Sequence, residues 1–214
     1  MKYLGFALLV LSSSTTALAD TDTYLALNVG ASVVDDSQEY LGAGNHQYSY
    51  DAGHAISVAL GVSLGDGYRV EVEVANQMNE LTFCCRRLGV TYDFNGVDNT
   101  VSTLMVNAYK DFYISDKFSG YLSGGIGAAY NAFDIRSYTI SKNGGAWTQR
   151  NLARPDDTVL AWQLGAGLGY DLTKEINLNV GWSYLSTADE FYFKPHSEVD
   201  FASNNVTAGI RYSF

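Results

Sequence analysis

Residues 68–74 read Tyr-Arg-Val-Glu-Val-Glu-Val, so that bulky apolar side chains alternate one for one with charged side chains. A period of two is typical of a β-strand, because successive side chains point to opposite faces of a sheet. One face therefore carries Tyr68, Val70, Val72 and Val74, and the other carries Arg69, Glu71 and Glu73. The preceding Gly65-Asp66-Gly67 predicts a tight turn from an earlier strand.

Seven further segments alternate in the same way over about ten residues each. Together they predict strands at residues 24–34, 54–64, 68–74, 102–110, 118–130, 159–172, 176–185 and 204–214. Long connections (35–53, 79–101, 131–158, 186–203) alternate with short ones (65–67, 111–117, 172–175). This alternation is typical of a membrane barrel with long external loops and short periplasmic turns. Ile135 to Ser141 is a stretch that could add a hairpin and raise the strand count.

Two features favour a barrel in lipid over a soluble sheet. The second face of most strands is made of Gly, Ala, Ser and Asn, which suits the narrow lumen of an eight-stranded barrel. Aromatic residues also gather near both strand ends, as two interfacial girdles would require. They are Tyr68, Phe118, Tyr170, Tyr212 and Phe214 at one end and Tyr130, Trp162 and Tyr184 at the other.

The predicted fold is therefore all-β, an eight-stranded antiparallel up-and-down transmembrane β-barrel. Unpaired backbone groups are costly in lipid, so the first and eighth strands must pair to close the wall. A soluble periplasmic β-sandwich is the alternative fold. The low proline count of 2 agrees with a chain that is mostly paired strand.

The first nineteen residues predict an export signal. Lys2 precedes an apolar stretch at residues 3–11 that is too short to span a bilayer, and Ala17-Leu18-Ala19 fits a cleavage site. We expect residues 1–19 to be a signal peptide cleaved after Ala19, and residues 20–214 to be the barrel domain. An uncleaved N-terminal anchor is the alternative.

Charge and cysteine content exclude some classes of protein. The net charge of −10 and the pI of about 4.5 argue against nucleic-acid binding, which needs a basic face.

Cys84 and Cys85 are adjacent in sequence and cannot form a relaxed disulfide with each other. A strained vicinal bond or a bond to another chain stays open, but two thiols without a set role is the favoured interpretation.

Four charged residues are expected to face the lumen: Arg69, Glu71, Glu73 and Arg211. An arginine on the lipid face at the midplane would cost about 2–4 kcal/mol. A buried charge needs a partner, so we expect Arg69 and Arg211 to pair with Glu71 or Glu73. The cluster could form an ion pathway or gate. A plug of salt bridges is favoured, since barrels of this size are normally filled.

The last eight residues, Thr-Ala-Gly-Ile-Arg-Tyr-Ser-Phe, resemble the C-terminal assembly signal of bacterial outer-membrane proteins. The residues that match are Thr207, Gly209, Tyr212 and Phe214. The resemblance implies that the barrel-assembly machinery binds this strand by adding it to a sheet edge. The alternative is an ordinary terminal strand with chance aromatics.

Residues 68–73, 104–109 and 161–167 resemble the opacity-type, porin-family outer-membrane β-barrel proteins, small OmpA-like barrels that include bacterial surface antigens. This resemblance covers nearly the whole mature chain through its strands. It implies an eight-stranded barrel in the cell outer membrane with surface exposure and antigenicity. The implied partners are outer-membrane lipids and lipopolysaccharide, with a host or extracellular ligand at the loops. No cofactor is expected.

The leading functional hypothesis is a surface-exposed interaction protein of the adhesin or surface-antigen type, with a plugged lumen. Aromatics in the loops could form a binding surface or pack against one another. They are Tyr40, Tyr48, Tyr50, Phe133, Tyr138, Trp147, Phe191, Tyr192 and Phe193. Arg136, Lys142, Arg150 and Arg154 make the third loop locally basic, and could contact lipopolysaccharide phosphates.

Two other activities are weighed against it. A small non-specific channel would need a wider barrel of about ten strands or more. Some small barrels are lipid A deacylases or proteases, so a Ser-His-acid arrangement is worth seeking. The run His196-Ser197-Glu198 has the right residue types, but neighbours on a strand point to opposite faces. His46 and His54 are too few for a metal site, and no enzyme is predicted.

Overall fold

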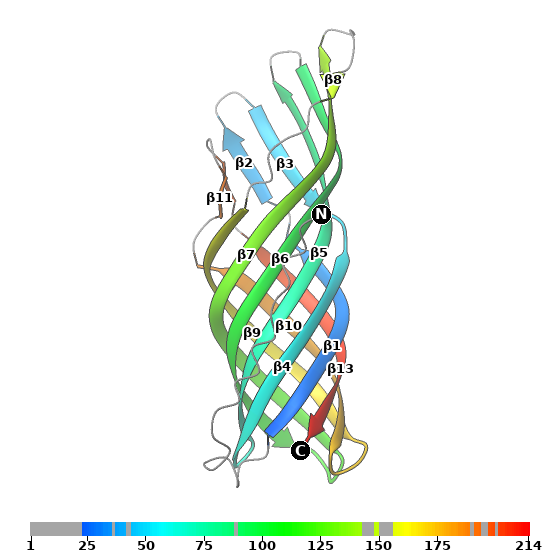
Figure 1. The fold of residues 1–214 in the computed structure, drawn as a ribbon, viewed down its shortest axis with the longest axis vertical. Helices are drawn as coiled ribbons and strands as arrows, with labels where there is room; N and C mark the ends of the chain where they lie inside the picture. Colours follow the sequence, from blue (N-terminus) through cyan, green and yellow to red (C-terminus); the bar gives the residue numbers. More distant parts are fainter. Residues whose placement is uncertain are drawn as a thin grey trace.

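Eight strands close into one antiparallel barrel in the computed structural model (Figure 1), which describes residues 23–35, 37–41, 44–87, 90–142, 148–149, 156–188, 191–193, 197–199 and 201–214. The wall consists of β1 (Thr23–Val34), β4 (Gly53–Gly65), β5 (Tyr68–Arg87), β6 (Val90–Tyr113), β7 (Phe118–Lys142), β9 (Asp156–Asp171), β10 (Ile176–Thr187) and β13 (Ala202–Ser213). Because β13 pairs with β1 and β5 pairs with β6, the wall has no open edge. The predicted barrel and the pairing of its first and last strands are confirmed.

The stagger between strands is regular. A row of paired residues that starts at Val33 and runs once around the wall returns to β1 at Thr23, ten residues earlier in the strand. A large stagger tilts the strands against the barrel axis, as Figure 1 shows. The interior of an eight-stranded barrel is only wide enough for side chains.

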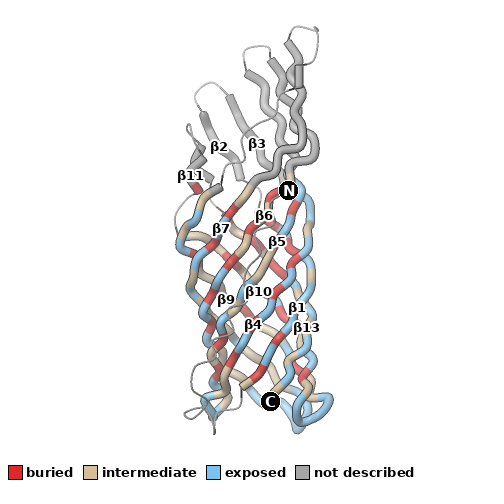
Figure 2. Tube along the Cα trace, viewed as in Figure 1, coloured by how far each residue is buried: buried red, intermediate tan, exposed pale blue. Residues whose placement is uncertain are grey.

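Large apolar side chains cover the outside of the wall. Val29, Leu60 and Val180 are 57–59% exposed, whereas Ala59 and Asn107 on the inner face are 0–1% exposed. Figure 2 shows this alternation along the strands. Such a surface needs lipid around it, so the soluble β-sandwich is excluded. No described residue belongs to a helix that is long and apolar enough to cross a membrane.

Aromatic side chains form a girdle at each end of the apolar surface. At the end with the short turns, the rings of Phe118 and Tyr170 lie 4.9 Å apart, and Tyr212 and Phe214 lie 5.4 Å apart. At the other end, the rings of Trp162 and Tyr184 lie 5.7 Å apart. These rings stand where the two membrane–water interfaces are expected.

Three short turns join the strands at one end of the barrel. Gly65, Asp66 and Gly67 have φ values of 82°, 53° and 76°, so the two glycines take a left-handed backbone that costs them little. The next turn is tighter than expected from the sequence, because β6 continues to Tyr113 and the Ile114 N–H donates to the carbonyl of Phe118 at 2.9 Å. The third turn lies between β9 and β10.

The predicted long loops are largely strand, and this is the main correction to the fold. β5, β6 and β7 contain 20, 24 and 25 residues, whereas β1, β10 and β13 contain 12 each. A transmembrane strand needs about 9–11 residues. Outside the bilayer no lipid requires an apolar face, so the alternation that marks a strand in sequence is lost there.

The long strands β5, β6 and β7 continue as a sheet beyond the length that a membrane span needs, and shorter strands extend this sheet. The hairpin of β2 (Ser37–Leu41) and β3 (Gly44–Tyr50) pairs with β5, and β8 (Thr148–Gln149) pairs with β7. β11 (Phe191–Phe193) and β12 (Ser197–Val199) form a separate pair. Ile135–Ser141 continues β7 and adds no further strand to the described barrel. Residues 1–19 lie outside the described part of the chain.

Candidate functional site

Arg69 lies at the centre of a polar cluster in the lumen near the short turns. Its guanidinium binds both carboxylate oxygens of Asp111, with Nε donating to Oδ2 at 2.7 Å and Nη2 donating to Oδ1 at 3.0 Å. Nη1 donates to Glu71 Oε1 at 2.9 Å and to the Tyr24 hydroxyl at 3.0 Å. The Tyr24 hydroxyl donates to the same Glu71 oxygen at 2.8 Å. One guanidinium therefore cross-links β1, β5 and β6.

Three tyrosines surround this guanidinium. The Arg69 Cζ lies 4.2 Å from the ring centroid of Tyr109, 5.6 Å from that of Tyr24 and 5.8 Å from that of Tyr121. A cation close to an aromatic face is stabilised by the ring quadrupole, and more so away from water. The cluster therefore combines ion pairing with aromatic packing.

Glycines on the inner face make room for the tyrosines. A Cβ atom at Gly61 would overlap the ring of Tyr24, and one at Gly181 would overlap the hydroxyl of Tyr121. The sequence indicates only that these positions are small. The structure shows that each one faces a particular large side chain on another strand.

Glu73 lies on the inner face without an ion pair to any described residue. Its Oε1 accepts hydrogen bonds from Gln163 Nε2 at 3.2 Å and from Asn107 Nδ2 at 3.3 Å. Gln163 Nε2 also donates to Asn107 Oδ1 at 2.6 Å. Uncharged donors, including the Ser57 hydroxyl, therefore hold this carboxylate, and no described cation forms an ion pair with it.

Arg211 differs from its expected role. Among the described residues, no carboxylate lies within ion-pair distance of its guanidinium, and its Cζ lies 5.3 Å from the ring centroid of Tyr24. The expected pairing of Arg211 with Glu71 or Glu73 is therefore wrong, whereas Arg69 does pair with Glu71 at 2.9 Å. The positions of the residues explain this. Glu71 already forms an ion pair with Arg69, and Glu73 lies on β5, three strands away from Arg211 on β13.

Toward the long hairpins the inner face becomes less charged. Ser32 and Ser203 donate to Gln77 Oε1 at 3.1 and 2.9 Å. Apolar side chains with at most 1% exposure also fill this part of the wall: Val101, Met105, Ala129, Ala161 and Leu185. Val101 and Leu185 lie at or beyond the ends of the predicted strands, although their even spacing from Met105 and Ser183 indicates the inner face.

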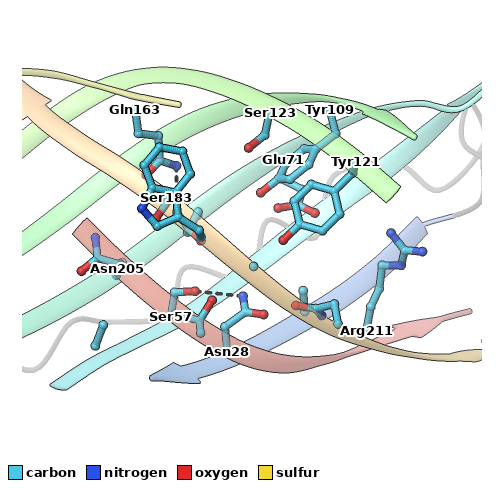
Figure 3. Close-up of a pocket in the computed structure, with 18 of the residues that line it drawn as sticks. Asn28, Ser57, Glu71, Tyr109, Tyr121, Ser123, Gln163, Ser183, Asn205 and Arg211 are labelled. Carbon is cyan, nitrogen blue, oxygen red and sulfur yellow. Dashed lines mark hydrogen bonds between the residues drawn. The ribbon is translucent and has the colours of Figure 1, made fainter. Parts of the chain in front are cut away.

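A polar cavity of about 100 Å³ lies within the barrel (Figure 3). Residues from every strand of the wall line it. Among them are Asn28, Ser57, Glu73, Gln163, Asn205 and Arg211. The volume corresponds to a few water molecules.

The residues of the predicted assembly signal lie on both faces of β13. Thr207 lines the cavity, and a Cβ at Gly209 would overlap Asn28. Tyr212 and Phe214 are exposed on the outer face, and the Phe214 N–H donates to the carbonyl of Thr23 at 2.9 Å. The strand thus closes the barrel, and its recognition during assembly stays a prediction.

The residues considered for catalysis or for a metal site form no cluster among the side chains that the structure describes. His54 is exposed on β4, His46 lies in β3, and His196 is outside the described residues. Cys84 lies in β5 next to Cys85, paired with Gln47 and Asp93 through the backbone. Within the described ranges, no three His, Cys, Asp or Glu side chains are grouped to hold a metal ion.

Comparison with known proteins agrees with this architecture. The outer membrane protein beta-barrel domain model matches residues 5–214. Outer membrane protein PagN of Salmonella typhimurium is 24% identical over 96% of this chain and 95% of its own length. An opacity protein of Neisseria gonorrhoeae is 25% identical over 70% of this chain and 66% of its own length.

A solved structure shows the same fold. Neisserial surface protein A (NspA) superposes with a TM-score of 0.61 at 16% identity, covering 90% of this chain and 97% of that one. This level of identity supports the fold and not a shared activity. The family match covers almost the whole chain and agrees with the closed wall and the lipid-facing surface. The chain belongs to the family of outer membrane protein β-barrel domains, and its place is the outer membrane.

Proposed function

We propose that the chain is a surface interaction protein of the adhesin or surface-antigen type. In this proposal the barrel holds it in the outer membrane, and the long hairpins bind a ligand outside the cell. One observation carries the proposal: β5, β6 and β7 contain about twice the residues that a membrane span requires. The extra length serves no purpose in crossing lipid.

The extension is an ordered sheet. Backbone pairing between β5 and β6 continues from Glu80 and Asp98 to Arg87 and Val90, with one irregularity after Leu81. β3 pairs with β5 on the other side, through Gln47 and Cys84. A paired sheet holds a binding surface in one position, so a partner need not fix a mobile loop when it binds.

The second part of the proposal is a lumen closed to solutes. The Arg69 cluster crosses the barrel near the short turns, and Val101, Met105 and Leu185 are fully buried farther along. Between them lies a cavity of about 100 Å³. A wall of eight strands leaves too little width for an open pore beside these side chains.

We further infer the partners of assembly and of the membrane surface. The signal peptide would direct export and be cleaved after Ala19, and the assembly machinery would bind the strand that ends at Phe214. The third connection carries four basic residues, which suit the phosphates of lipopolysaccharide. Nothing in the proposal requires a cofactor or an enzymatic activity.

The surface role is tested by shortening the long hairpins at residues that are paired across two strands. Glu80 and Asp98 are paired, so an Asn-Gly turn between them removes 81–97 and keeps the strand register. Ala132 and Asp156 are also paired, and the same turn there removes 133–155. Bacteria displaying the full or trimmed chain are then compared for attachment to cultured epithelial cells and to extracellular-matrix proteins.

We expect both trimmed barrels to insert, judged by the change in gel migration on boiling, and at least one to lose attachment. Equal attachment by the doubly trimmed barrel would refute the surface role.

The closed lumen is tested separately by conductance of the refolded chain in planar bilayers. Steady single-channel currents would refute the plug and favour the small channel.

A further inference from the structure

Two lysines lie at one end of the lipid-facing surface. Lys110 is on β6, on the same face as Leu104 and Val106, which are 52–54% exposed on the outside of the wall. Lys117 lies in the turn just before β7. Both belong to the aromatic girdle beside the short turns, at the end of the barrel where β13 ends (Figure 1). Short turns of such barrels face the periplasm, so these lysines meet the leaflet of glycerophospholipids.

Each ammonium group lies near the ring of a girdle tyrosine. Lys110 Nζ is 4.0 Å from the ring centroid of Tyr68, and Lys117 Nζ is 6.0 Å from that of Tyr170. These are the two lysine–tyrosine pairs. Lys110 Nζ also donates to the backbone carbonyl of Asp66 in the turn before β5. The ring and the carbonyl together hold this ammonium group at the outer surface of the barrel.

The positive charges of the two lysines have no counter-ion within the described part of the chain. No described carboxylate lies within ion-pair distance of either ammonium group. A lysine has three donors and no acceptor, and the carbonyl of Asp66 uses one donor of Lys110. Two donors of Lys110 therefore stay available for a negatively charged group outside the chain.

The aromatic girdle at the opposite end of the barrel has different partners. Trp182 Nε1 donates to Asn204 Oδ1 at 3.2 Å, and Asn204 Nδ2 donates to Asp35 Oδ1 at 3.3 Å. The three lysines whose side chains are described all lie near the short turns: Lys110, Lys117 and Lys174. Among the described side chains, contacts between lysines and girdle rings are thus confined to one of the two membrane interfaces.

We propose that the two lysine–tyrosine pairs bind the phosphate groups of glycerophospholipids in the periplasmic leaflet. The phosphate oxygens would accept charge-assisted hydrogen bonds from the ammonium groups and supply the missing negative charge. The acyl chains would lie along the apolar wall, where Leu122 pairs laterally with Lys110 and is 56% exposed. This site concerns the barrel alone, so it does not depend on the proposed surface role.

The test uses the full mature chain in detergent micelles. Native mass spectrometry counts the phosphatidylglycerol molecules bound to each chain as the lipid concentration rises. The competitors are diacylglycerol, which has the same acyl chains without a phosphate, and inorganic phosphate. Lys110→Met and Lys117→Met, singly and combined, remove charge but keep an apolar stem, whereas Lys110→Arg keeps the charge. Lys174→Met, in the exposed turn between β9 and β10, is the matched control. Heat-dependent gel migration shows that each variant is folded.

We expect two lipids at saturation on the parent chain and on Lys174→Met, one on each single girdle variant and none on the double variant. Lys110→Arg should keep two, because a guanidinium also binds phosphate. The proposal is overturned if the parent binds no lipid, if the double variant binds as much as the parent, or if Lys174→Met loses as much as Lys110→Met. Displacement by an equal concentration of diacylglycerol would show that only the acyl chains are recognised. Displacement by an equal concentration of inorganic phosphate would assign the site to a free ion, and either displacement would also overturn the proposal.

Discussion

Replacing Arg69 with methionine should destabilise the barrel more than any other single change in the lumen. The side chain makes four hydrogen bonds, two to Asp111, one to Glu71 and one to Tyr24. Methionine keeps the apolar stem next to Tyr109 and removes every donor. Glu71 and Asp111 then face the lumen without a cation.

The expected loss is about 3–5 kcal/mol of unfolding free energy, the usual cost of removing one partner of a buried ion pair. Arg69→Lys should lose less, because it keeps the charge but not the planar fork that binds both oxygens of Asp111. The measurement is urea unfolding of the chain in lipid vesicles, followed by tryptophan fluorescence and extrapolated linearly to zero urea.

Arg211→Met is the matched control for this experiment. Arg211 also lies in the lumen but forms no ion pair with a described residue, and its ring contact with Tyr24 is worth about 1 kcal/mol. If Arg69→Met and Arg211→Met lower stability by the same amount, the Arg69 cluster does not hold the three strands together. A fall of less than 1 kcal/mol for Arg69→Met would lead to the same conclusion.

Three further outcomes follow from the same geometry. Gly181→Ala should cost about 1–3 kcal/mol by overlap with the Tyr121 hydroxyl, and adding Tyr121→Phe should restore part of it in the same unfolding assay. Val180→Arg should cost about 2–4 kcal/mol, because Val180 is 57% exposed on the lipid face; an unchanged midpoint in urea would contradict that orientation. Deleting Phe214 should lower the amount of heat-modifiable barrel in isolated outer membranes, and normal levels would argue against the assembly signal.

Some of the lumen was within reach of the sequence. Strand parity places Arg69, Glu71 and Glu73 inside, as the structure shows. The same parity places Tyr24 and Asp111 inside, but the sequence predicts a turn at Asp111, whereas β6 continues to Tyr113. Arg69 therefore has a partner 42 residues away in the sequence, which only the length of β6 places inside the lumen.

The sequence by itself determined the strand pattern, the closed eight-stranded wall and the face on which each residue lies. It could do so because lipid outside and a narrow lumen inside demand different side chains at alternate positions, and that demand acts on each strand separately. Only the tertiary structure decided which inner residues meet, since contacts across the lumen depend on the stagger of ten residues around the whole wall. It also decided how far β5, β6 and β7 extend, because beyond the membrane backbone pairing continues without any alternation to reveal it.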